Sequence, residues 1–185
     1  MNEVRHLTMA ELEAGLPHIL AAPADTGEVV MIVMRPDIDA RETVQRCELS
    51  LEDGLVGDNW KTRGALKRIP RKPEIERQLT LMNARAAALV AVTEDRWPLA
   101  GDQFYVDLDL SDANVPAGTQ LRMGTAVVEV TEPPHTGCRK FIQRFGKDAM
   151  KWVNSESGRR HNLRGVNARV VSEGRVSAGD TIRKL

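Results

Sequence analysis

The chain has 185 residues, 42% of them hydrophobic, and its 26 Lys and Arg are balanced by 26 Asp and Glu. These values fit one domain of ordinary size with a buried core, and the zero net charge excludes a global attraction to nucleic acid or membranes. The sequence has no apolar leader and no run of about 18 apolar residues, so we expect a cytoplasmic protein without a membrane partner.

The first 26 residues predict a helical extension ahead of a main domain that spans residues 27–185. Thr8 and Glu11 have the spacing of a capping box, and the apolar residues after them fall on one helical stripe. Pro17 removes a hydrogen bond from this helix and clashes with the preceding turn. We therefore expect a break just before it.

The middle of the chain predicts strands, a loop and a short helix. Residues 28–34 are an apolar, β-branched run typical of a buried strand, and the alternation around Cys47 turns this cysteine inward as a small core residue. Residues 61–77 hold seven Lys or Arg against two Glu and predict a long basic loop. The alanine-rich residues 84–92 predict the helix.

The C-terminal half predicts a mainly β fold. Short strand-like runs are separated by Gly, Pro, Asp and Asn, a pattern typical of a barrel or sandwich and unlike a parallel α/β sheet. Strict alternation in residues 103–110 places Phe104 and Val106 on a buried face, and Tyr105 and Asp107 on a face exposed to water. We expect a mainly β single domain with a few helices.

The stretch PPHTGCRKF at residues 133–141 carries the clearest chemical signal. The two prolines end a strand, and an amphipathic helix with one cationic face begins close to Cys138. This places the sulfur among unpaired backbone N–H groups, next to Arg139 and Lys140. A cysteine in such a setting acts as a nucleophile or as a ligand of a soft metal.

His135 and Gly146 lie on either side of Cys138 in the sequence, and each carries a prediction of its own. His135 lies three residues upstream, where it forms a pocket wall or a partner of the sulfur; zinc is not favoured, since a structural zinc site needs about four ligands. Gly146 is expected to divide the helix in two, because glycine costs about 1 kcal/mol relative to alanine inside a helix.

Five stretches in sequence order together resemble the MOSC domain family. They are GLVGD (54–58), RQLTLMNAR (77–85), PPHTGCRKF (133–141), RGVNARVV (164–171) and GRVSAGDTI (174–182). The module is named for the C-terminal part of molybdenum cofactor sulfurase, and it also occurs in the mitochondrial amidoxime-reducing component and in small stand-alone bacterial proteins. The resemblance implies a β-barrel that binds the molybdenum cofactor (molybdopterin), with Cys138 as the metal ligand or as a carrier of sulfur.

The resemblance also implies a set of site residues. Cys138 and His135 are the candidate catalytic residues, and Cys138 is the candidate metal ligand. The candidate contacts to the anionic cofactor are Asp58, Arg77, Thr136, Gly137, Arg139, Lys140 and Arg164. Asp58 has an alternative interpretation as the residue that fixes a turn.

Three functions are consistent with the sequence. The first is a molybdenum-cofactor-binding oxidoreductase component that acts on N-hydroxylated or similar small compounds, with electrons from a separate donor protein. The second is a sulfur carrier that forms a persulfide on Cys138 for metal–sulfur cofactor assembly; the sequence has no pyridoxal-phosphate lysine domain, so a separate cysteine desulfurase would supply the sulfur. The third is an anion- or nucleic-acid-binding module that uses the basic loop 61–77, although nucleic acid is disfavoured because the loop lacks interleaved aromatics.

Overall fold

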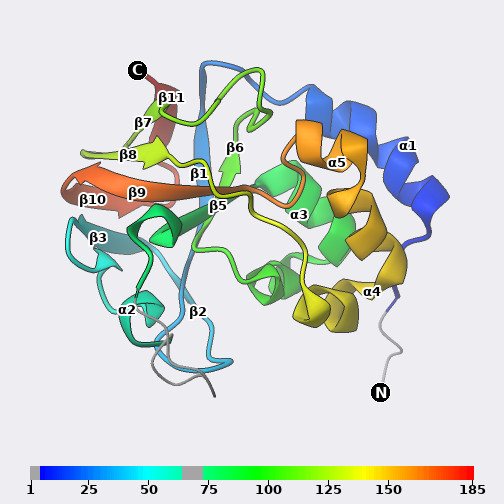
Figure 1. The fold of residues 1–185 in the computed structure, drawn as a ribbon, viewed down its shortest axis with the longest axis horizontal. Coiled ribbons are helices and arrows are strands. Elements are labelled where there is room, and N and C mark those ends of the chain that lie inside the picture. Colours follow the sequence, from blue (N-terminus) through cyan, green and yellow to red (C-terminus); the bar gives the residue numbers. More distant parts are fainter. Residues whose placement is uncertain (1–4, 64–72) are drawn as a thin grey trace.

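The computed structural model describes residues 5–63 and 73–185 (Figure 1). The strands are β1 (Thr26–Met34), β2 (Glu42–Val44), β3 (Arg46–Ser50), β4 (Gly54–Leu55), β5 (Leu79–Asn83), β6 (Phe104–Asp107), β7 (Gln120–Met123), β8 (Ala126–Val130), β9 (Val166–Ser172), β10 (Gly174–Ser177) and β11 (Thr181–Lys184). The helices are α1 (Met9–Leu20), α2 (Trp60–Arg63), α3 (Ala84–Ala91), α4 (Arg139–Asn154) and α5 (Glu156–Arg160), with 3₁₀ turns η1 (Ile75–Arg77) and η2 (Glu94–Ala100).

A closed β-barrel forms the centre of the described chain. Its strands follow the order β11-β7-β8-β9-β5-β6-β1, and pairing of β1 with β11 closes the ring. The pair β5–β6 is parallel, and the other barrel pairs are antiparallel. Strand β2 pairs with β1 in antiparallel orientation and lies outside the closed ring. Strands β10, β3 and β4 form a smaller sheet beside the barrel. The predicted mainly β barrel with a few helices is confirmed.

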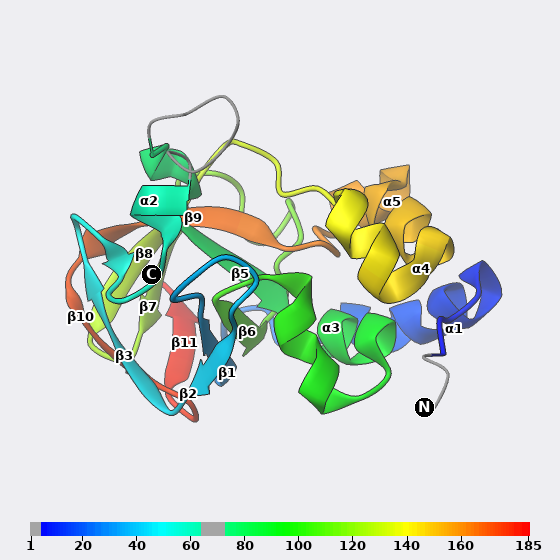
Figure 2. The same cartoon turned by 90° about the horizontal axis from the view of Figure 1, so that it is seen from below.

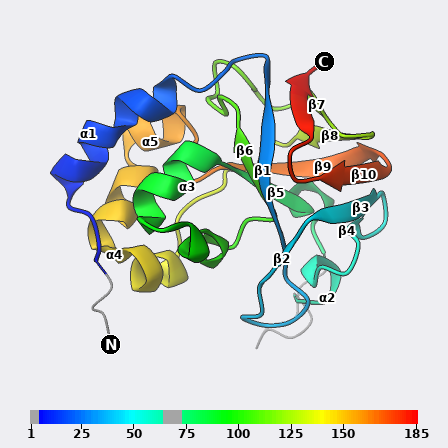
Figure 3. The same ribbon diagram turned by 180° about the vertical axis from the view of Figure 1, so that it is seen from behind.

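Helices α1, α3, α4 and α5 gather on one side of the barrel, as Figures 1, 2 and 3 all show. Alternate side chains of β5 and β6 therefore enter two different apolar clusters. Leu81 and Phe104 point into the barrel, whereas Met82 and Tyr105 pack under the helices. Within the described residues, no helix combines the length and hydropathy needed to cross a bilayer.

The predicted wet face of β6 is wrong at Tyr105. Its side chain is fully buried, and its hydroxyl donates a hydrogen bond to the Trp97 carbonyl oxygen at 2.6 Å. The alternation in the sequence is real, but helices cover the face that we expected water to cover. A strand that is buried on both faces can still alternate when one of its faces carries a satisfied polar group.

Two helix predictions had different outcomes. The capping box at Thr8 and Glu11 is present, but helix α1 continues through Pro17, so the predicted break is wrong. Leu12 and Ile19, on either side of the proline, are both buried, and their packing offsets the roughly 3 kcal/mol that an internal proline costs. Gly146 does divide α4, with φ 91° and ψ 169°.

Candidate functional site

Cys138 is the N-cap residue of α4 and follows the extended segment that leaves β8. Its side chain is exposed and forms no capping hydrogen bond, so the sulfur is open to a ligand. Cys47 is buried, as predicted, and burial raises the pKa of its thiol to about 12. Cys138 is therefore the accessible thiol of the two.

A pocket of about 510 Å³ opens beside Cys138, and we call it the arginine pocket. It is lined by Arg35, Trp60, Arg63, Pro73, Glu74, Arg77, Thr80, Gly101, His135, Thr136, Cys138, Arg164 and Asn167. Four of these residues are arginines, and the carboxylate among them, Glu74, is bound to Arg77 at 2.9 Å. The pocket wall is therefore strongly cationic.

Arg35 is held in this wall by a buried ion pair with Asp58. Arg35 Nε lies 2.7 Å and Nη2 lies 2.8 Å from the two carboxylate oxygens, and the side chains are 5% and 0% exposed. Asp58 also accepts hydrogen bonds from the backbone N–H groups of Arg35 and Trp60. The bidentate geometry fixes the plane of the guanidinium, so Arg35 enters the pocket in a set orientation.

A second buried ion pair joins Arg164 to Asp102. Arg164 Nη1 donates to Asp102 Oδ2 at 2.6 Å, and Nη2 donates to the Ala100 carbonyl at 2.7 Å. The Arg164 guanidinium also lies 5.2 Å from the centre of the Phe141 ring. Burial raises the pKa of Asp102, and the Arg164 charge opposes that rise. Arg164 is thereby fixed by a carboxylate, a carbonyl and an aromatic face.

His135 lies against the same carboxylate. Its Nδ1 is 3.3 Å from Asp102 Oδ1, and neither atom has a hydrogen-bond partner elsewhere in residues 5–63 and 73–185. Burial lowers the pKa of His135 well below its usual value, and the charges of Arg164 and Arg35 lower it further. The imidazole is therefore neutral at neutral pH. With its proton on Nδ1 facing Asp102, the Nε2 atom is a hydrogen-bond acceptor.

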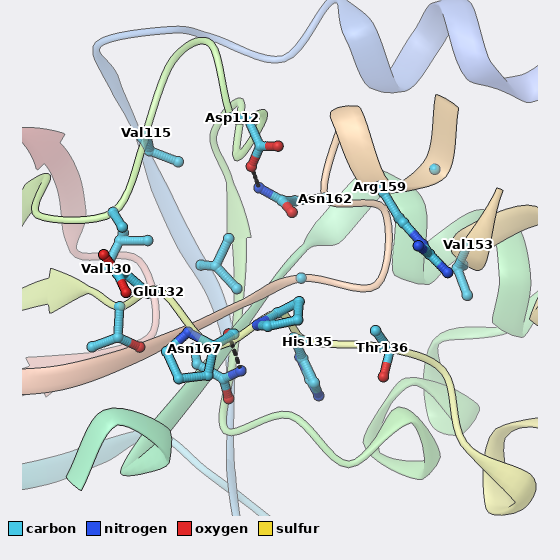
Figure 4. Close-up of a pocket in the computed structure, with 17 residues that line it drawn as sticks. Asp112, Val115, Val130, Glu132, His135, Thr136, Val153, Arg159, Asn162 and Asn167 are labelled. Atoms are coloured by element: carbon cyan, nitrogen blue, oxygen red, sulfur yellow. Dashed lines mark hydrogen bonds between the residues drawn. The ribbon is translucent and has the colours of Figure 1, made fainter. Parts of the chain in front are cut away.

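Two further pockets adjoin the first. The Asp39 pocket, of about 450 Å³, lies on the other side of Cys138 and shares Arg35, Arg63 and Gly101 with the arginine pocket. The Asn162 pocket, of about 220 Å³, is shown in Figure 4. In that view, a hydrogen bond joins Asn162 to Asp112, while Asn167 is bound to a backbone oxygen of the segment that carries His135.

The structure brings together part of the predicted site. His135, Thr136, Cys138, Arg77 and Arg164 all line the arginine pocket. Lys140 lines the Asp39 pocket instead. These positions agree with a site at Cys138, while the ligand contacts themselves stay predictions.

Three predicted cofactor contacts, Asp58, Gly137 and Arg139, line neither the arginine pocket nor the Asp39 pocket. The Asp58 side chain is buried and contacts Arg35, which lines the pocket. Asp58 also accepts a hydrogen bond from the backbone N–H of Trp60, as expected from its alternative interpretation as the residue that fixes a turn. The Gly137 N–H donates to Asn154 Oδ1 at 3.0 Å, so this donor has a partner within the chain. Arg139 is exposed and lines neither pocket at Cys138, because the first turn of α4 directs it away. Most of the predicted basic loop, residues 64–72, lies outside the described residues.

Sequence analysis missed Arg35, Arg63 and Asp102. Arg35 follows an apolar strand directly, and a charged residue at such a strand end is a usable signal. Asp102 follows a glycine, and an aspartate after a glycine usually indicates an ordinary turn. Its partner Arg164 is 62 residues away, and only the folded barrel brings the two together.

No group of three or more His, Cys, Asp and Glu side chains in the described ranges is placed to hold a metal ion. A metal held by protein side chains alone needs about four such ligands. The cluster at Cys138 instead offers one sulfur beside several arginines.

Comparisons with known proteins agree with this fold. The family model of the MOSC domain matches residues 43–183. Comparison with curated proteins gives no significant match. Among solved structures, the YuaD protein of Bacillus subtilis matches with a TM-score of 0.59 and 16% identity, covering 86% of this chain and 95% of that one.

Two proteins named YiiM are also similar in structure. The Escherichia coli protein has a TM-score of 0.54 at 21% identity, with 85% of this chain and 69% of that one covered. The Geobacillus stearothermophilus protein has a TM-score of 0.57 at 16% identity, with 86% and 75% covered. At these identities the likeness concerns the fold alone.

Proposed function

The chain belongs to the MOSC domain family, which is associated with molybdenum cofactor binding, and on this premise we propose that the arginine pocket binds that cofactor with Cys138 as a metal ligand. The observation that carries the proposal is an exposed thiol at the edge of a pocket lined by four arginines. The cofactor has the matching chemistry, because its phosphate is anionic and its metal is bound by soft sulfur ligands.

The residues of the pocket fit such a ligand. Arg35 and Arg164 are each held by a buried carboxylate, so their remaining donors are oriented before any ligand arrives. Arg164 Nε is buried without a partner in the described chain, as are Asp102 Oδ1 and His135 Nδ1. Arginines presented in fixed planes bind phosphate better than mobile lysines do.

The pocket residues have distinct parts in the proposed chemistry. When bound, the cofactor would supply a metal that exchanges electrons with a substrate. Cys138 would anchor that metal from the protein side. Reduction of an N–OH group consumes two protons together with two electrons. His135, neutral and with Nε2 as an acceptor, would therefore take up a proton from water and pass it to the leaving hydroxyl of the substrate, and Asp102 would stabilise the transient imidazolium.

We place the protein among oxidoreductase components that act on N-hydroxylated or similar small compounds. Such a reaction consumes two electrons, and the described fold is a single small barrel with its helices. A separate protein would deliver those electrons to the cofactor. The open position of Cys138 leaves the proposed metal site accessible to such a donor and to a substrate.

The test is the cofactor content of protein purified from a host that makes molybdenum cofactor. We expect about one molybdenum and one pterin per wild-type chain, and a large loss in Cys138→Ser. Cys47→Ala is the matched control, since Cys47 is buried in the barrel core and should leave the cofactor content unchanged. Wild-type protein without molybdenum from such a host would contradict the proposal.

A sulfur carrier is the second candidate, and the same exposed thiol supports it. A persulfide on Cys138 would project from the start of α4 into a cationic pocket. Incubation with a cysteine desulfurase and cysteine should then add the mass of one sulfur atom to the wild type and to Cys47→Ala, but not to Cys138→Ser. No mass gain in the wild type would remove this candidate.

A further inference from the structure

The Asp39 pocket touches the same sulfur as the arginine pocket. Cys138 and Gly101 line both pockets, so a ligand in either one reaches the same atom from a different side. If the arginine pocket holds the cofactor, the Asp39 pocket is the open approach to Cys138. Its volume of about 450 Å³ lies within the range of small-molecule sites.

Positive charge exceeds negative charge in this second pocket. Lys140 and Arg144 share one carboxylate, Asp39, at 2.6 and 3.3 Å. Asp37, the other carboxylate in the lining, accepts a hydrogen bond from the backbone N–H of Ile38 at 2.6 Å. A pocket with this balance favours an anionic ligand.

Arg41 has an incomplete set of hydrogen bonds, with Nη1 donating to the Ala40 carbonyl at 2.5 Å. Its Nε atom is buried and has no hydrogen-bond partner in the part of the chain that the structure describes. Burial lowers the pKa of Arg41, and the nearby charges of Arg144 and Arg35 lower it further. A bound carboxylate would supply the missing acceptor and offset the repulsion among these cations.

Gly101 lines both pockets and lies close to Arg41. A Cβ atom at position 101 would lie 3.8 Å from Arg41 Nη2, which places the Arg41 guanidinium beside one of the residues that line both pockets. Gly101 has φ 93°, a conformation that residues with side chains rarely adopt. Arg41 is therefore within reach of a ligand that extends toward Cys138.

The same pocket has an apolar part. Ile38 is 58% exposed at its rim and supplies most of this apolar surface, while the almost fully buried Ala100 and Phe141 complete the lining. A fully hydrated ion such as phosphate gains nothing from this surface, whereas an organic acid with a hydrocarbon or aromatic body does. The lining thus matches a small molecule that is charged at one end and apolar at the other.

We propose that the Asp39 pocket is the substrate site and that it selects small organic acids, with the carboxylate at Arg41 and Lys140 and the reacting end toward Cys138. This inference rests on the proposed function and narrows its substrates from N-hydroxylated compounds in general to those that carry a carboxylate. Neutral analogues would lack the charge that the pocket compensates.

The test uses benzoate and its neutral analogue benzamide, titrated calorimetrically into the full-length chain. We expect benzoate to bind at least about tenfold more tightly than benzamide, since hydrogen bonds to an ionised carboxylate are stronger than those to a neutral amide. Arg41→Gln and Lys140→Gln should each lower benzoate affinity about tenfold. Lys147→Gln removes an exposed charge from the same helix as Lys140 and should leave it within about twofold.

Several results would overturn the inference. Equal affinity for benzoate and benzamide would remove the charge selection, and unchanged benzoate affinity in both Arg41→Gln and Lys140→Gln would place the anion elsewhere. Benzoate binding that is lost in Arg77→Gln but kept in Arg41→Gln would assign it to the arginine pocket. These titrations need no molybdenum. Their outcome is therefore independent of the cofactor test, and each of the two proposals can be contradicted separately.

Discussion

Arg164 donates a hydrogen bond at 2.6 Å to Asp102, a carboxylate whose side chain has no exposed surface. The other carboxylate oxygen faces His135 Nδ1 at 3.3 Å. One buried acid thus binds an arginine of the arginine pocket and lies next to its histidine. The Arg35–Asp58 pair is a second buried ion pair that holds an arginine of the same pocket. The cationic wall of the pocket therefore depends on two acids that do not line it.

Asp102→Asn should destabilise the protein strongly. It removes the charge that compensates Arg164, and breaking a buried pair by changing one partner typically costs about 3–5 kcal/mol. The measurement is the free energy of unfolding in urea. Arg169→Gln is the control, because it breaks a partly exposed pair with Glu129 and should cost about 1 kcal/mol or less. Similar losses in the two variants would show that Asp102 has no special electrostatic part.

His135 should make stability depend on pH in a defined window. Its pKa in the folded chain is well below the usual 6.5, so below that value the unfolded state binds the extra proton. The contribution is complete above about pH 6.5 and is lost as pH falls toward the folded pKa, at up to about 1.4 kcal/mol per pH unit. Unfolding free energies of the wild type and His135→Gln should therefore converge between about pH 7 and pH 5.5. Parallel pH profiles would contradict the neutral, buried imidazole.

Gly165→Ala should be far more damaging than a comparable glycine change. Gly165 has φ 102°, and an added Cβ would collide with the Leu81 carbonyl oxygen. Gly118 has φ 90° but open space around its Cβ position, so Gly118→Ala isolates the cost of the conformation, about 1–3 kcal/mol. We expect Gly165→Ala to exceed that cost clearly and to displace the neighbouring Arg164. Equal thermal stabilities of the two variants would refute the close packing of β5 against this turn.

Patterns local to the chain predicted the parts of the fold that depend on local physics. The mainly β class, the capping box at Thr8, the buried Cys47 and the division of α4 at Gly146 all follow from residue types at short spacing. The burial of Tyr105 and the continuity of α1 through Pro17 do not, because both depend on the helical layer packed beside the barrel.

The candidate site divides in the same way. Cys138 and His135 were evident because prolines, a glycine and a basic helix surround them in the sequence. Arg35 and Asp102 become site residues through partners that are 23 and 62 positions away. A strand end can single out Arg35, but a single sequence does not show which residues pair across such distances. The Asp39 pocket was not predicted either, because the sequence around Asp39 contains no recognisable motif.

The most direct test of the account is the number of sulfur ligands on the metal, measured by molybdenum X-ray absorption on wild type and Cys138→Ser from a host that makes the cofactor. If the Cys138 thiolate is the protein ligand, any molybdenum that remains bound in Cys138→Ser will have one sulfur ligand fewer than the molybdenum of the wild type. An identical sulfur count in the two proteins, or a wild type that carries no molybdenum, would contradict it.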